Sequence, residues 1–181
     1  MTKCFWILFV TLSMWSCHDN SNIAKTNNID TVRLFVDSVV SGKAMAWDNF
    51  QLSKQAYDSI NSINRVTREF YFDAAIKMLS KGDALLAIEL RKNILKYLKE
   101  KPREFTETIS NYPTDTLMDM ATAVGVELYE IDKQSALEQS KQLSDLLNKN
   151  FDSQDSLKNM KVSKFIFHIE QPIKAMQATN R

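Results

Sequence analysis

Glycine and proline are scarce in this chain, with three of each among 181 residues. Antiparallel sandwiches and barrels join many short strands by tight turns, and these two residues supply the backbone conformations that such turns need. Helices need them only near their ends. The scarcity argues against an all-β architecture and favours an all-α fold.

Cysteine is equally rare. The two cysteines, Cys4 and Cys17, both lie near the start of the chain, so we expect no disulfide in the folded part. His18 and His168 are the two histidines, and no C-x-x-C, H-x-x-x-H or calcium-loop spacing occurs. We therefore expect neither a metal nor another cofactor, and we interpret His168 as a partly buried helix residue.

Familiar catalytic signatures are missing as well. There is no G-x-S-x-G nucleophile motif, and Gly42, Gly82 and Gly125 are too far apart for a glycine-rich phosphate loop. No cysteine follows Cys17 to act as a nucleophile. The sequence predicts a protein that is not an enzyme.

Neither sign of charge dominates, because 23 basic side chains oppose 22 acidic ones. Proteins that bind nucleic acids usually carry a positive excess whose field attracts phosphates. We expect no nucleic-acid partner.

The chain opens with a short apolar leader. Lys3 is its only charge, an apolar run follows, and Ser16 directly precedes Cys17. A basic start, a short apolar middle and a small residue at the cut are typical of a secretory signal. With a cysteine directly after that small residue, the segment resembles a bacterial lipoprotein signal.

This resemblance implies a signal peptide over residues 1–16 and lipidation of Cys17, by a diacylglyceryl group and usually a further acyl chain such as palmitate. Several acyl chains hold a protein stably at a bilayer, whereas one does so only marginally. His18 stands where lipoproteins kept at the inner membrane of proteobacteria have Asp. The resemblance thus implies a location at the outer membrane, facing the periplasm.

Three other interpretations of the leader stay open. A membrane-spanning helix would need about 20 apolar residues, and this run is shorter. An ordinary secretory signal would end in an A-x-A-like site, which is absent. The first helix of a cytosolic domain would be apolar on every face, which a surface helix does not tolerate.

Residues 17–29 are polar and rich in asparagine, which predicts a flexible tether. Across residues 30–181, apolar side chains recur at helical spacing and predict a single bundle of seven or eight helices. Residues 162–169 are rich in β-formers, and there we favour a helix over a strand. Helix starts are expected at Asp30, Ala44, Ser62, Asp83, Pro102, Thr114 or Thr116, Asp132 and Ser153, with a stop at Gly42. The expected buried faces include Ile63, Val66, Phe70, Ala74 and Leu79 in one helix, and Leu86, Leu90, Ile94, Tyr97 and Leu98 in the next.

Glu69 and Asp73 form the best candidate pair of catalytic carboxylates, because their i, i+4 spacing places them on one helical face. A glycoside hydrolase needs two carboxyl groups facing each other across a cleft. The alternative is a solvated helix face with ion pairs to Arg65 and Lys77, which we favour. An envelope hydrolase using this pair stays the less favoured alternative function.

A basic stripe is the most suggestive surface feature. Lys92, Lys96, Lys99 and Arg103 recur at helical spacing. Positive charge near a helix C-terminus is stabilising in itself, so the stripe needs no ligand. Its functional interpretation is contact with anionic lipid, envelope phosphates or an acidic protein.

One further likeness lies at residues 97–102, where a helix ends in the pattern Y-L-x-x-x-P. This stretch resembles small helical periplasmic immunity proteins that neutralise secreted amidases. The resemblance implies binding to a toxin as an alternative function. From the sequence as a whole we expect a lipid-anchored helical module that binds an envelope protein; the oligomeric state is not predicted.

Overall fold

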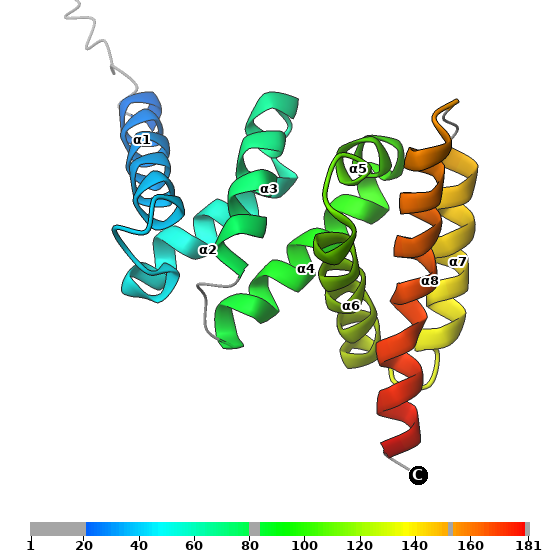
Figure 1. Cartoon of the computed structure of the whole chain (residues 1–181). Coiled ribbons are helices and arrows are strands. Elements are labelled where there is room, and N and C mark those ends of the chain that lie inside the picture. The colour runs from blue at the N-terminus through cyan, green and yellow to red at the C-terminus, as the bar shows by residue number, and fades with distance from the viewer. Residues whose placement is uncertain (1–20, 80–83, 152–153, 180–181) are drawn as a thin grey trace, which may run out of the picture.

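The computed structural model describes residues 21–79, 84–151 and 154–179, with side-chain surroundings from residue 31 onward. Within these ranges the protein contains eight α-helices and no strand, which confirms the all-α prediction (Figure 1). The signal peptide, Cys17, and the caps expected at Asp83 and Ser153 lie outside the described residues. The α-helices are α1 (Ser21–Val40), α2 (Phe50–Asp58), α3 (Arg65–Leu79), α4 (Ala84–Glu100), α5 (Pro102–Ile109), α6 (Thr114–Ile131), α7 (Ala136–Asn150) and α8 (Ser156–Thr179), with two short 3-10 helices, η1 (Ala46–Asn49) and η2 (Ser59–Asn61).

The helices pack around one continuous apolar core, with α4 at its centre. Helices α1, α2 and α3 gather on one side of α4, and α6, α7 and α8 on the other (Figure 1). Among the described helices, α6 and α8 share the most extensive packing contact. No helix in the described ranges combines the length and apolar character needed to cross a bilayer.

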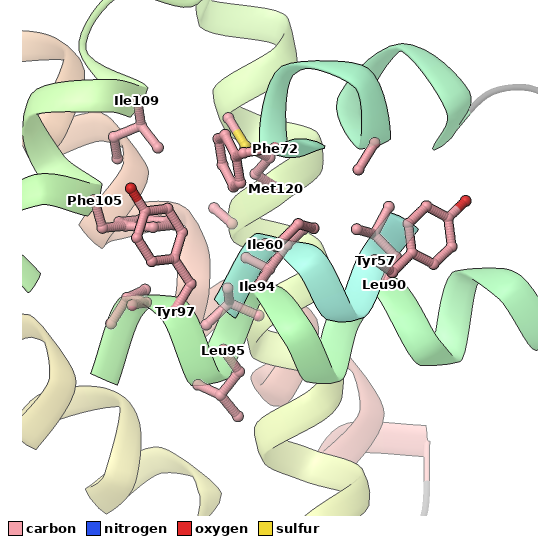
Figure 2. Packing of buried hydrophobic residues seen from close by; sticks show 14 of the residues in the cluster. Tyr57, Ile60, Phe72, Leu90, Ile94, Leu95, Tyr97, Phe105, Ile109 and Met120 are labelled. Atoms are coloured by element: carbon pink, nitrogen blue, oxygen red, sulfur yellow. The ribbon is translucent and has the colours of Figure 1, made fainter. Parts of the chain in front are cut away.

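An aromatic cluster joins α3, α4 and α5 at the middle of this core (Figure 2). The ring of Phe72 lies edge-on to Tyr97 at 5.5 Å and to Phe105 at 5.9 Å between centroids. Tyr97 and Phe105 meet at 5.5 Å in the same way. Edge-to-face pairs of this kind add about 0.5–1.5 kcal/mol each beyond burial, so the cluster fixes how these three helices meet.

Several expectations from the sequence are confirmed. All five apolar residues expected on the inner face of α4 are buried. Gly42 has a positive φ of 78° just after α1, the left-handed conformation typical of a helix stop. Pro102 occupies the first turn of α5, and residues 162–169 are helical.

Several helix starts and one buried face need correction. Helix α2 begins at Phe50, after the 3-10 helix η1, and not at Ala44. Helix α3 begins at Arg65 and α7 at Ala136, a few residues after the starts expected at Ser62 and Asp132. Helix α1 begins at Ser21, before the predicted start at Asp30; extending a helix beyond a packed segment adds one hydrogen bond per residue.

The buried face of α3 differs from the prediction, because Val66 is 75% exposed, and Ile63, which lies before the helix, is fully exposed. Arg68 and Tyr71 occupy the interior instead, since Arg68 finds buried partners there.

Gly125 allows α6 and α8 to approach closely. A Cβ atom at this position would meet the carbonyl oxygen of Ile169 and would lie 2.6 Å from Cγ of Pro172. Pro172 lies inside α8, and its ring and missing N–H bend or weaken a helix at that point. The two residues fit against each other only because position 125 has no side chain.

Gly125→Ala is therefore expected to destabilise the protein by about 1–3 kcal/mol through overpacking. Helix propensity alone predicts the opposite sign, a gain of roughly 0.5–1 kcal/mol. The measurement is urea unfolding monitored by circular dichroism, with Thr122→Ala at an exposed position of α6 as control. A stabilised Gly125→Ala variant would show that the α6–α8 contact is looser than described.

Candidate functional site

The carboxylates predicted from the sequence lie on the outer face of α3. Arg65 Nε binds Glu69 Oε1 at 2.8 Å, and Lys77 Nζ binds Asp73 Oδ2 at 2.6 Å. The ion pairs expected with Arg65 and Lys77 are thus confirmed. Tyr112, which the sequence did not single out, donates its hydroxyl to Asp73 Oδ1 at 3.2 Å.

Arg65, Glu69, Asp73 and Tyr112 line a shallow hollow of about 420 Å³ between α3 and the end of α5, with Glu107 on the facing side. Burial raises the pKa of the Tyr112 hydroxyl, and the neighbouring Asp73 adds to the effect. Tyr112 therefore stays protonated and acts as a hydrogen-bond donor. Asp73 uses both of its oxygens in these contacts, whereas Glu69 uses Oε1.

The basic stripe does not continue along one helix. Lys92, Lys96 and Lys99 are exposed on α4; Lys92 lies 3.4 Å from a Glu89 oxygen and Lys96 4.0 Å from Glu100. Arg103 belongs to α5, which begins at Pro102. The helical spacing read across this break does not place Arg103 on the α4 stripe.

A buried ion pair links α3 to α5. Arg68 is 5% exposed, and its guanidinium donates to both oxygens of Glu104, at 2.9 and 2.7 Å. Its remaining nitrogen donates to the carbonyls of Ser62 and Ile63, at 2.6 and 2.7 Å. A bidentate arginine–carboxylate pair is both strong and specific in geometry.

Tyr97 of α4 completes this cluster by donating its hydroxyl to Glu104 Oε1 at 3.0 Å. The Arg68 hydrogen bonds lower the pKa of Glu104, and burial raises the pKa of Tyr97 to about 12. The carboxylate is thus charged and the phenol neutral at physiological pH. Three helices and the segment before α3 meet at one carboxyl group.

A second buried carboxylate lies between α4 and α6. Glu127 is 4% exposed, and one of its oxygens lies 3.8 Å from Nε of Arg91. That nitrogen makes no hydrogen bond within the described structure. Burial raises the pKa of Glu127, and the distant Arg91 offsets this only in part.

A hollow of about 710 Å³ opens between α5, the end of α7 and the start of α8. Arg103 and Glu107 line it on α5, Lys149 at the end of α7, and Lys158 at the start of α8. A neighbouring hollow of about 390 Å³ continues it past Arg103 toward Arg65. This end of the molecule therefore carries a continuous, mostly cationic surface.

The outer face of α8 carries exposed apolar side chains. Phe167 is 63% exposed and lines a groove of about 370 Å³ between α7 and α8 together with Ile166. The ring of His168 lies edge-on to Phe167 at 5.4 Å. His168 itself is half-buried, as expected from the sequence.

In the described parts of the chain, no group of three or more His, Cys, Asp or Glu side chains could hold a metal ion. Comparisons with protein-family models, with characterised proteins and with solved structures give no match. The site is therefore defined by its own geometry alone.

Glu104→Ala is expected to lower the free energy of unfolding by about 3–5 kcal/mol, because it leaves Arg68 buried without its anion. Since the pKa of Glu104 is lowered in the folded state, its contribution is present above the unfolded pKa and is lost as pH falls through the folded pKa. The free energy of unfolding is measured from neutral to acidic pH for the parent and the variant. The difference between the two should shrink as the pH falls. As a control, Lys174→Gln breaks an exposed pair with Glu170 and should cost less than about 1 kcal/mol.

Glu127→Gln should show the opposite pH dependence. The pKa of Glu127 is raised in the folded state, so its contribution is present below the unfolded pKa and is lost as pH rises through the folded pKa. The variant is expected to match the parent near the acid limit and to exceed it in stability at neutral and alkaline pH. Glu130→Gln, at an exposed position of the same helix, should produce no such divergence. Parallel curves for parent and Glu127→Gln would contradict the prediction.

Proposed function

We propose that this chain is a lipid-anchored helical module of a bacterial cell envelope that binds another envelope protein and catalyses no reaction. The leader pattern around Cys17 supports the anchor, and several acyl chains on one residue hold a protein durably at a bilayer. The location that follows is the periplasmic face of the outer membrane.

The exposed apolar surface of α8 is the observation that carries the binding role. Phe167, a large ring on a helix surface, is exposed beside a groove that also has polar walls from Ser144 and Asp145. Protein interfaces combine an aromatic anchor with a polar rim. We therefore assign the partner's contact to the groove between α7 and α8.

The condition of Glu69 and Asp73 supports the non-enzymatic part of the proposal. Glu69 Oε1 binds Arg65, and both oxygens of Asp73 bind Lys77 and Tyr112. The contacts with the two cations favour charged carboxylates over a protonated general acid. Replacing both carboxylates by amides should therefore leave the biological role intact.

The test uses the protein in its native envelope. A photo-crosslinking amino acid at position 167 is expected to capture one discrete envelope protein, and Phe167→Ser should abolish co-purification of that protein. The same crosslinker at Lys96, on the stripe predicted from the sequence, serves as the matched control. Capture at position 96 alone would move the interface to α4 and contradict the assignment.

The anchor is tested separately with Cys17→Ser, which should block processing of the leader and change the membrane fractionation of the chain. Unchanged processing and unchanged fractionation would refute the anchor, while leaving the crosslinking result to decide the binding role.

A further inference from the structure

The hollow between α5, α7 and α8 brings together cations from three helices. Arg103, Lys149 and Lys158 line it, and Glu107 is the single carboxylate among its described lining residues. Both oxygens of Glu107 already face guanidinium groups, Arg103 at 3.1 Å and Arg65 at 3.7 Å. No described anion in the hollow is left to balance the two lysines.

Lys161, at the same end of the molecule, has a structural role and serves as a comparison. Its Nζ donates to the carbonyl of Ser110, the C-cap residue directly after α5, at 3.1 Å. The ammonium groups of Lys149 and Lys158 make no such bond and no ion pair with any described residue. Helix capping therefore accounts for Lys161, whereas Lys149 and Lys158 have no structural partner among the residues that the structure describes.

We propose that this hollow binds a phosphate group. Converging cations repel one another, and an anion that enters between them removes this cost and gains charge-assisted hydrogen bonds. Lysine ammonium groups bind phosphate as point charges from variable directions, and an arginine fork adds a planar contact. Ser110 and Asn111 add polar groups at the wall of the hollow.

The surroundings favour a phosphate carried by an anionic phospholipid over free phosphate. Leu157 and Met160, which flank Lys158 in the first turns of α8, are 54% and 45% exposed. Cations beside exposed apolar side chains match a headgroup next to its acyl chains.

The orientation of the molecule agrees with this source. The N-terminal end of α1 lies at the same end of the molecule as the start of α8 and the end of α7 (Figure 1). If Cys17 carries the lipid of the proposed function, on which this one step rests, the hollow lies at the end of the molecule from which the chain leads to the anchor.

The test compares the full chain with a Lys149→Gln/Lys158→Gln double variant, using phosphatidylcholine vesicles with and without phosphatidylglycerol. Parent and variant share the same N-terminal segment, so its own affinity for bilayers cancels. The preference of the parent for anionic vesicles is expected to fall by on the order of 30-fold in the variant, since each lysine near an anionic surface contributes about 1 kcal/mol. Added salt should weaken the preference of the parent.

A Lys92→Gln/Lys96→Gln variant removes the same charge from α4 and should retain most of the preference. Inorganic phosphate, followed by NMR of the lysine side chains, separates the two sources. Shifts at Lys149 and Lys158 without any vesicle preference support a phosphate site for a soluble ligand. If the double variant retains both responses, or if the α4 variant loses as much, the proposal is overturned.

None of these outcomes depends on processing at Cys17. Failure of the anchor and failure of the phosphate site are therefore separate results.

Discussion

The bidentate pair between Arg68 and Glu104 is the interaction on which the arrangement of α3, α4 and α5 depends. Removing two charges from water costs several kcal/mol per ion, and only good geometry with every remaining donor satisfied offsets that cost. Here the guanidinium also binds two backbone carbonyls, and the carboxylate also accepts from Tyr97. The aromatic rings of Phe72, Tyr97 and Phe105 join the same three helices, so their edge-to-face contacts and the charge pair hold one arrangement together.

Helix α4 also makes a polar contact with each of the two groups of helices around it. Asn93 donates to Asp58 at 3.2 Å and accepts from Asn61 at 2.7 Å, which ties α4 to the end of α2 and to η2. On its other side Arg91 faces Glu127 of α6. Apolar burial supplies most of the stability of such a bundle, and we attribute the register of the helices to these polar contacts.

The parts of the fold that could be predicted were those in which local pattern and final environment agree. The inner face of α4 is a clean apolar stripe, and glycine or proline stands at the ends of α1 and α5, so these elements were evident from spacing alone. Around the start of α3 the apolar pattern predicted the wrong buried face, because Ile63 and Val66 face solvent while Arg68 is buried. A charged residue becomes an interior residue only through a partner far along the chain, and nothing local in the sequence marks Glu104 as that partner.

In the candidate site, too, some contacts could be predicted from the sequence and others could not. The pairs that Glu69 and Asp73 make with Arg65 and Lys77 follow helical spacing and could be predicted. The cationic hollow could not, because Lys149 and Lys158 come from different helices and Arg103 was assigned to a stripe that ends before it. Only packing of α5 against α7 and α8 brings these side chains to one place.

The hydrogen bonds from Arg68 to the carbonyls of residues 62 and 63 have a consequence for the binding of a partner at this surface. Ile63 is an apolar side chain held out in water on a backbone that buried hydrogen bonds keep fixed. A flexible loop loses conformational entropy when a partner covers it, and that loss subtracts from affinity. Here the ordering has already taken place during folding, so a surface that covers Ile63 would gain the full benefit of displacing water from it.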